Sequence, residues 1–250
     1  MRPLEGKHAL VTGGTRGIGR ATALKLACAG CNVAIVYYNS HQEAETVCLE
    51  IEGMGRKAFA IQADVGNPDS LAEAFVTLKK EFGELDIVVS NAATGVLRPA
   101  MELTLKHWRK VMETNALALN TLAQLVAPMM TKGGRIVAIS SLGSMRAIPH
   151  YAFIGASKAA LESLARSLAQ ELGPRGIRVN VVNAGAVDTD ALKHFPNREA
   201  LLGEHARKAP AGPTLTPEDV ANGVFLLCLP EAEMITGHTL MVDGGYSISG

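Results

Sequence analysis

Short apolar runs alternate along the chain with longer segments in which apolar residues recur every three or four positions. The short runs are rich in β-branched residues and predict strands. They cover residues 9–11, 33–38, 58–61, 87–89, 136–139, 177–182 and 239–242. The longer segments predict helices over 18–29, 43–54, 70–82, 103–130, 156–172 and 217–229.

This alternation is typical of α/β proteins, because parallel strands need long crossover connections that helices provide. Strand runs that are apolar at nearly every position fit a sheet covered on both faces. We therefore expect an α/β fold with a doubly wound, mostly parallel Rossmann-type sheet and helices on both faces. No linker or repeat divides the chain, so residues 1–250 are expected to form a single domain. Residues 188–213 interrupt the alternation with three prolines and predict a lid over a site.

Composition and charge exclude several classes of function. The chain carries 24 Lys and Arg residues against 24 Asp and Glu residues, so no net field attracts nucleic acid or an anionic membrane. Its longest apolar stretches fall short of the roughly 18 residues of a membrane span, and no secretory segment opens the chain. The four cysteines and seven histidines are dispersed. We expect a cytoplasmic protein that binds no metal.

A glycine-rich turn follows the first predicted strand. After Thr12 the chain reads Gly13, Gly14, Thr15, Arg16, Gly17, Ile18 and Gly19, and a helical pattern begins at once. Glycines let the chain turn sharply and bring its amide groups against a pyrophosphate at the N-terminus of a helix. The spacing of the glycines differs from the common G-x-G-x-x-G, but the strand, turn and helix context predicts dinucleotide binding.

The end of the second predicted strand indicates which dinucleotide is bound. An NAD site expects an acidic residue there to hold the ribose hydroxyls. This chain has Tyr38, Asn39 and Ser40 instead, so no carboxylate repels a 2′-phosphate. Arg16 in the glycine turn is suited to bind that phosphate, which favours NADPH. The alternative is that Arg16 is a solvated turn residue.

A tyrosine and a lysine form the third candidate feature. Tyr151 and Lys158 are seven residues apart, which on a helix places both on one face about 10 Å apart. Tyrosine ionises near pH 10, so a nearby ammonium group is needed to stabilise its phenolate. The pair is a candidate for acid–base chemistry, although such a pair can also occur by coincidence.

Together these features resemble the short-chain dehydrogenase/reductase family over essentially the whole chain. The matching residues, in the family's order, are the turn at 12–19, Asp64, Asn91, Asn115, Ser140, Ser141, the segment 180–189 and the Val-Asp-Gly-Gly sequence at 242–245. The resemblance implies that Asp64 and Val65 lie near the adenine and Asn91 near its ribose. It places Lys158 on the nicotinamide ribose, and it implies a homotetramer. The further cofactor-binding residues that we expect are Ala92, Ala184, Gly185, Val187 and Thr189, the last two beside the carboxamide.

One departure from the family pattern narrows the expected reaction. Most members place the catalytic tyrosine four residues before the lysine, but this chain has Ile154 there. Its tyrosine at position 151 resembles that of the NADPH-dependent enoyl-acyl-carrier-protein reductase III subfamily, as do the segments 91–99, 140–144 and 188–199. The resemblance implies reduction of the 2,3-double bond of an acyl thioester carried by acyl carrier protein, as in fatty-acid synthesis.

Geometry gives a separate reason for the same reaction. In a ketoreductase the hydride attacks the carbonyl carbon, so the proton donor must reach an oxygen one bond away. In an enoyl thioester the hydride attacks the β-carbon, and charge develops on an oxygen three bonds away. A donor moved back by a helical turn can follow that oxygen. We therefore expect Tyr151 to hydrogen-bond the enolate oxygen, while Lys158 fixes the ribose and lowers the pKa of the phenol.

Several alternatives remain open from the sequence. A ketoreductase or another hydroxy-dehydrogenase of the same family is the first, and a non-catalytic nucleotide-binding scaffold is the second. Ser141 either contacts substrate or only ends a strand, and Asn115 either keeps a helix-kink and water-relay role or is a buried structural residue. The lid residues that suit an acyl chain, or that merely pack on the surface, are Leu192, Phe195, Leu201 and Leu202.

Overall fold

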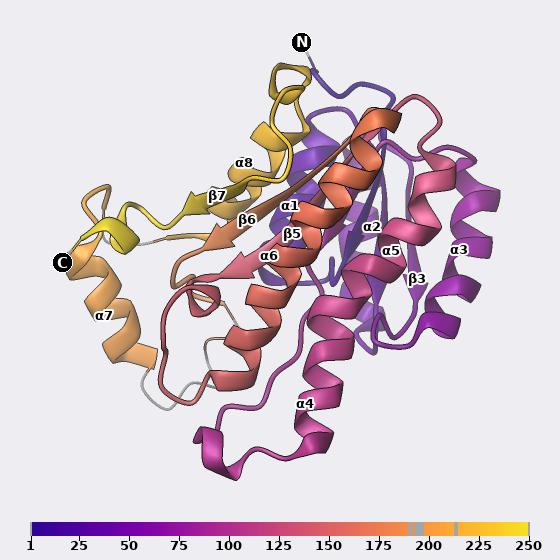
Figure 1. The fold of residues 1–250 in the computed structure, drawn as a ribbon. Coiled ribbons are helices and arrows are strands. Elements are labelled where there is room, and N and C mark those ends of the chain that lie inside the picture. The colour runs from indigo at the N-terminus through magenta and orange to yellow at the C-terminus, as the bar shows by residue number, and fades with distance from the viewer. Residues whose placement is uncertain (1, 190–191, 193–197, 213–214, 250) are drawn as a thin grey trace.

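The computed structural model describes residues 2–189, 192, 198–212 and 215–249. Seven parallel strands form one sheet in the order β3-β2-β1-β4-β5-β6-β7 (Figure 1). The strands are β1 (His8–Thr12), β2 (Asn32–Tyr37), β3 (Ala58–Gln62), β4 (Ile87–Ser90), β5 (Gly134–Ser141), β6 (Ile177–Ala184) and β7 (Thr239–Val242). All seven strands predicted from the apolar runs are confirmed, and the sheet is entirely rather than mostly parallel.

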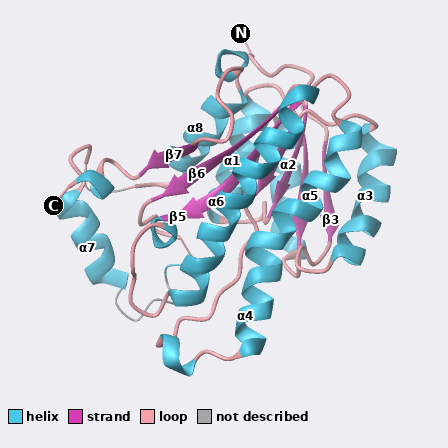
Figure 2. Ribbon diagram, in the orientation of Figure 1, coloured by secondary structure: helices cyan, strands magenta, loops and turns pink. Residues whose placement is uncertain are grey.

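Helices connect consecutive strands and cover both faces of the sheet, as the alternation predicts (Figure 2). They are α1 (Gly17–Cys28), α2 (His41–Gly53), α3 (Pro68–Phe82), α4 (Leu105–Met112), α5 (Ala118–Val126), α6 (Ala152–Leu172), α7 (Arg198–Lys208) and α8 (Pro217–Cys228). Five of these, α1, α2, α3, α6 and α8, each match one predicted helix to within a few residues at both ends. The expected helix at 103–130 is divided into α4 and α5 by a π-helical turn, Glu113–Leu117.

Two apolar clusters form the core, one on each face of the sheet. Leu10 of β1 packs into the cluster that includes α3, α5 and α6, whereas its neighbours Ala9 and Val11 pack into the cluster that includes α1, α2 and α8. Successive side chains of a strand point to opposite faces, so a strand between two helix layers is apolar at every position. This explains why the strand runs show no polar alternation.

The sheet topology determines where a ligand can bind. From β1 the chain proceeds to β2 and β3 on one side, and then returns to β4 on the other side. The loops that follow β1 and β4 therefore run in opposite directions and leave a crevice at the carboxyl ends of the strands. The polar residues singled out in the sequence follow these strand ends, which brings them to one edge of the sheet.

The helix α7 was not predicted. It lies outside the two helix layers, beside the carboxyl ends of β5, β6 and β7 (Figure 2). The helix α7 belongs to the expected lid segment, and it borders the crevice. Phe195, Pro196 and Pro213 of that lid lie outside the described residues. Within the described parts of the chain, no helix is both long and apolar enough to cross a membrane.

Candidate active site

The glycine turn between β1 and α1 is shaped to receive an anion. Gly13 and Gly17 have φ angles of 66° and 52°, a region that favours glycine. A Cβ atom at Gly19 would overlap the carbonyl oxygen of Gly13, so the turn needs glycine there too. The first turn of α1 carries no acidic residue. The positive end of this helix is therefore open to a pyrophosphate group, and the turn fits a dinucleotide cofactor.

Asn91 holds the glycine turn against the end of β4. Its side-chain amide donates to the carbonyl oxygens of Thr12 and Gly13, at 2.9 and 3.2 Å. In return, the hydroxyl of Thr12 accepts from the backbone amides of Asn91 and Ala92, at 3.0 and 3.1 Å. These four hydrogen bonds hold the loop after β1 and the loop after β4 in a fixed position relative to each other.

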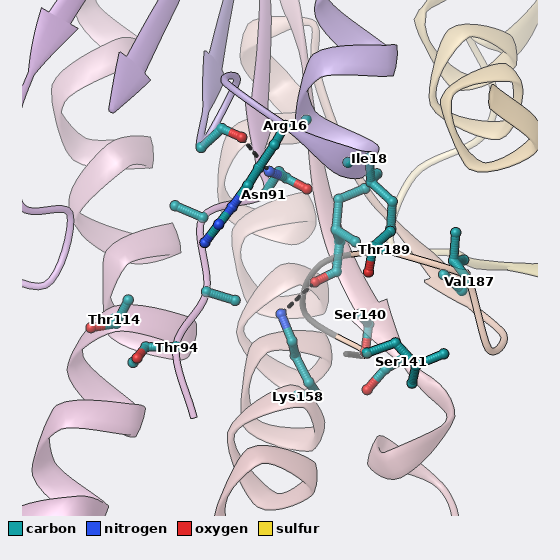
Figure 3. Close-up of a pocket in the computed structure, with 18 of the residues that line it drawn as sticks. Arg16, Ile18, Asn91, Thr94, Thr114, Ser140, Ser141, Lys158, Val187 and Thr189 are labelled. Carbon is teal, nitrogen blue, oxygen red and sulfur yellow. Dashed lines mark hydrogen bonds between the residues drawn. The ribbon is translucent and has the colours of Figure 1, made fainter. Parts of the chain in front are cut away.

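A cavity of about 670 Å³ runs along the carboxyl ends of the strands. It brings together every predicted site residue except Asn115. Those lining it are Gly13, Thr15, Arg16, Gly17, Ile18, Gly19, Tyr38, Asn39, Ser40, Asp64, Val65, Asn91, Ala92, Ser141, Tyr151, Lys158, Ala184, Gly185, Val187 and Thr189. Figure 3 shows Lys158 between Thr94 on one side and Ser141 on the other.

The phenol of Tyr151 lies beside Ser141 at the end of β5. The two hydroxyl oxygens are 3.1 Å apart and form a hydrogen bond in which either can be the donor. The expected placement of Tyr151 on a helix is wrong, because α6 begins at Ala152 and Tyr151 is its N-cap with non-helical backbone angles. His150 just before it has a φ of 62°, so the chain turns there and helical spacing does not apply to Tyr151.

Two glycines make room for this position of the tyrosine. A Cβ atom at Gly143 would lie 2.5 Å from two carbon atoms of the Tyr151 ring. A Cβ atom at Gly155, in the first turn of α6, would lie 2.5 Å from the carbonyl oxygen of Gly143. The start of α6 therefore packs directly against the 3₁₀ turn Leu142–Ser144, and the tyrosine ring covers that turn.

Ile154 occupies the position at which most family members have their tyrosine. Its side chain is buried, and a Cβ atom added to Gly95 would overlap it. An apolar side chain packed against the loop after β4 has no proton to donate. Among the described residues, Tyr151 is therefore the tyrosine that faces the cavity beside Lys158 and Ser141.

Lys158 is buried, and its ammonium group donates to the carbonyl oxygen of Ile139 at 2.8 Å. Burial lowers the pKa of Lys158 to about 8, against an opposing effect of the Glu162 carboxylate. Burial also raises the pKa of the Tyr151 phenol above its ordinary value, and the hydrogen bond with Ser141 opposes this only in part. The expected lowering of the phenol pKa is therefore wrong, and Tyr151 stays protonated at neutral pH.

Asn115 lies behind the cavity wall rather than in it. Its side chain accepts from the backbone amide of Thr94 at 2.8 Å and donates to the carbonyl oxygen of the same residue at 2.9 Å. It also donates to the hydroxyl of Ser157 at 2.9 Å. The residue sits in the π-helical turn that separates α4 from α5. The structure bears on both open roles: the π-helical turn places Asn115 at a helix kink, and its three hydrogen bonds make it a buried, partnered polar residue.

Lys110 is a cavity residue that sequence reasoning did not place there. Its ammonium group, on α4, forms an ion pair with Asp64 at 3.0 Å and lies 6.0 Å from the centre of the Tyr38 ring. It therefore closes the end of the cavity that the resemblance gives to the adenine. Nothing in the local sequence marks this lysine, because its partners lie in segments that only the fold brings near.

A second unpredicted group closes the opposite end of the cavity. The Tyr246 ring stacks on the buried His205 ring with centres 5.2 Å apart, and the Arg146 guanidinium lies 5.2 Å from the Tyr246 ring centre. Leu192 and Leu201 of the expected lid line this end, whereas Leu202 is not among the described residues that do so. The described residues contain no group of three His, Cys, Asp or Glu side chains arranged to hold a metal.

Comparison with known proteins identifies the class of this fold and site. The family model described as Enoyl-(Acyl carrier protein) reductase matches residues 13–247. The 1-cyclohexenylcarbonyl-CoA reductase of Streptomyces collinus is 39% identical over 241 residues, which cover 96% of this chain and 86% of that protein. The hydroxynaphthalene reductase-like protein of Metarhizium brunneum is 36% identical over 256 residues, covering 98% and 96%.

Solved structures agree with this class. A short-chain dehydrogenase from Burkholderia cenocepacia, in complex with NADP, has a TM-score of 0.90 and 38% identity, covering 98% of this chain and 99% of that chain. The enoyl-acyl-carrier-protein reductase of Anaplasma phagocytophilum, in complex with NAD, has a TM-score of 0.91 and 28% identity, covering 99% and 96%. The chain belongs to the short-chain dehydrogenase/reductase family. It is an oxidoreductase of the kind that uses a nicotinamide dinucleotide.

Proposed function

We propose that this protein reduces the 2,3-double bond of an enoyl thioester with NADPH. The observation that carries the proposal is the position of Tyr151, which lines the cavity with Lys158 and is hydrogen-bonded to Ser141. This tyrosine precedes α6, while the buried Ile154 fills the family's usual place. A phenol set back along the chain suits an oxygen that lies three bonds from the carbon receiving hydride. The family model and the unsaturated thioester in the name of the Streptomyces relative support the same reaction.

The residues of this chain have separate tasks in the proposed reaction. NADPH, when bound, supplies the hydride. The Tyr151 hydroxyl, kept protonated by burial, donates a hydrogen bond to the thioester oxygen as negative charge develops there. Ser141 orients that hydroxyl, and Lys158 binds the nicotinamide ribose. A proton taken up from solvent water at the α-carbon then completes the saturated thioester.

NADPH is proposed over NADH because of the charges around the adenosine end. The residues after β2 offer no carboxylate, and Arg16 is exposed at the mouth of the same cavity. An arginine binds a phosphate through several charge-assisted hydrogen bonds. The neighbour from Burkholderia that was solved with NADP supports this choice.

The proposal is tested by following NADPH oxidation with crotonyl and acetoacetyl thioesters side by side. We expect turnover of the crotonyl thioester and loss of most of that activity in Tyr151→Phe, which lacks only the hydroxyl. Each thioester is offered both on acyl carrier protein and on coenzyme A, and we propose that the carrier-protein form is preferred. Turnover of the keto substrate alone would refute the proposal, and near-full enoyl activity in Tyr151→Phe would refute the role assigned to the Tyr151 hydroxyl.

A ketoreductase is the second candidate, and one observation favours it. Ser141 and Tyr151 present two hydroxyls 3.1 Å apart toward the cavity, an arrangement that can also bind a single carbonyl oxygen. The Metarhizium relative, whose name describes reduction of hydroxynaphthalene compounds, is consistent with this candidate. The paired assay described above distinguishes the two reactions directly.

A further inference from the structure

A buried carboxylate on α6 has no part in the reaction described so far. Glu162 lies one helical turn after Lys158 and is 8% exposed. One of its oxygens, Oε1, accepts from the Ser140 hydroxyl at 2.6 Å and from the Asn183 amide at 2.9 Å. A buried acidic residue is costly unless it is hydrogen-bonded and paired, so this position needs an explanation.

We propose that Glu162 is a positioning residue that keeps the neighbouring Lys158 charged and fixes the strand ends on which Ser141 is carried. This proposal depends on the proposed function in one respect: it takes from it that Lys158 binds the cofactor. Glu162 itself does not line the cavity in the described chain, so it acts through its neighbours.

The hydrogen bonds of Glu162 join three elements of the site. Ser140 is the penultimate residue of β5, next to Ser141, Asn183 lies near the end of β6, and Glu162 itself belongs to α6. The Asn183 amide also lies 3.0 Å from both the carbonyl oxygen of Ser141 and the hydroxyl of Ser144. The carboxylate is thus the acceptor at the centre of a network that holds the Ser141 backbone against β6 and the helix.

The charge of Glu162 has a separate effect on Lys158. The ammonium group of Lys158 is bonded to a neutral carbonyl oxygen, and burial disfavours its charged form. The residues of β5 and of the start of α6 that line the cavity with it, among those the structure describes, include the neutral groups of Ser140, Ser141 and Tyr151.

Other charged or titratable side chains line the same cavity but belong to other elements: Arg16, Tyr37, Tyr38, Asp64, Lys110, Arg146, Glu204, His205 and Tyr246. Among the described residues, Glu162 is the side chain that raises the pKa of Lys158. Its carboxylate therefore opposes the loss of the ammonium charge, which burial promotes.

The test removes the charge of Glu162 and keeps the shape of its side chain. Glu162→Gln retains an oxygen that can accept from Ser140 and Asn183, whereas Glu171→Gln removes an exposed charge from the same helix and serves as the control. NADPH affinity is measured by cofactor fluorescence between pH 6.5 and 8. With half of Lys158 deprotonated near pH 8, the native affinity should fall about twofold over this range.

We expect the affinity of Glu162→Gln to fall about fivefold over the same range, because the ammonium group deprotonates at lower pH when the neighbouring negative charge is gone. Glu171→Gln should match the native protein. Glu162→Asp, which keeps the charge on a shorter side chain, should recover the native pH profile even if its affinity is lower throughout. A native profile in Glu162→Gln, or an Asp variant that behaves like the Gln variant, would overturn the proposal.

Thermal unfolding gives a second readout that needs neither cofactor nor substrate. Unfolded lysine binds its proton up to about pH 10.5 and folded Lys158 only to about pH 8, so this residue makes stability rise with pH between the two. In Glu162→Gln the rise should begin below pH 8. At pH 7 the variant should unfold at lower temperature than the native protein, and this difference should be smaller in a Lys158→Met background, where only the hydrogen-bond network of residue 162 is affected. An equal difference in both backgrounds would overturn the proposal and leave the enoyl reductase assignment untouched.

Discussion

Replacing Gly143 with alanine tests whether the position of the Tyr151 ring determines the reaction rate. The added Cβ atom would lie 2.5 Å from ring atoms Cδ1 and Cε1, whereas ordinary contacts begin near 3.4 Å. The ring must therefore move by about 1 Å. The added Cβ atom also has little room beside α6, because the Cα atom of Gly155 lies 3.3 Å from the same position.

A movement of this size removes the tyrosine from its productive position. The hydrogen bond between the hydroxyls of Tyr151 and Ser141 is already 3.1 Å long, and a shift of about 1 Å breaks it. Misplacement of a reacting group by about 1 Å can lower a rate by about 100-fold. We therefore expect kcat with a crotonyl thioester to fall by about this factor, while the affinity for NADPH, measured by fluorescence, stays within about twofold.

The matched control is Gly53→Ala at the end of α2, where a Cβ atom meets nothing within 4 Å. It should leave both kcat and NADPH affinity unchanged. If Gly143→Ala kept a kcat within about threefold of the native value, the packing of the ring on this glycine would not matter. The assigned role of the Tyr151 hydroxyl would then lose its structural basis.

Four further outcomes are expected. Arg16→Ser should raise the KM for NADPH about tenfold or more without affecting NADH, and an equal effect on both would count against the 2′-phosphate contact. Lys158→Arg should remove the decline in kcat/KM above about pH 8, since guanidinium stays charged; a persistent decline would assign it to another group. Asn115→Leu should lower the free energy of unfolding in urea by about 2 kcal/mol, because three hydrogen bonds are lost, and a change below about 0.5 kcal/mol would contradict this. Sedimentation at micromolar concentration should show the expected homotetramer, and a monomer would contradict it. The exposed Leu226 and Met234 are candidates for residues buried between its subunits.

Much of the fold could be predicted from the sequence because the pattern that marks each element lies within that element. The apolar runs and the helical spacing lie within single elements, so all seven strands and most helices are recognisable. The glycine turn is equally local, since Gly13 and Gly17 need their conformation for the turn itself. The sequence does not predict α7 because few of its residues are apolar and prolines lie on both sides of it.

The parts of the site that were missed depend on tertiary structure. Lys110 reaches the cavity only because the π-helical turn and the sheet bring α4 close to Asp64. Tyr151 was placed on a helix because its spacing to Lys158 is helical, whereas a turn at His150 removes it from that helix. Burial then raises the pKa of the phenol, and no sequence pattern shows how deeply a side chain is buried.

Tyr151 precedes α6 and Lys158 lies within it. The two residues therefore belong to segments that can be substituted independently. Substitutions in the loop from Ser144 to His150 can redirect the hydroxyl toward another oxygen while Lys158 keeps its place in the helix. Relatives built on this plan can therefore acquire new substrates through a few changes in one short loop. Directed evolution for altered substrate range should begin with that segment and leave the helix intact.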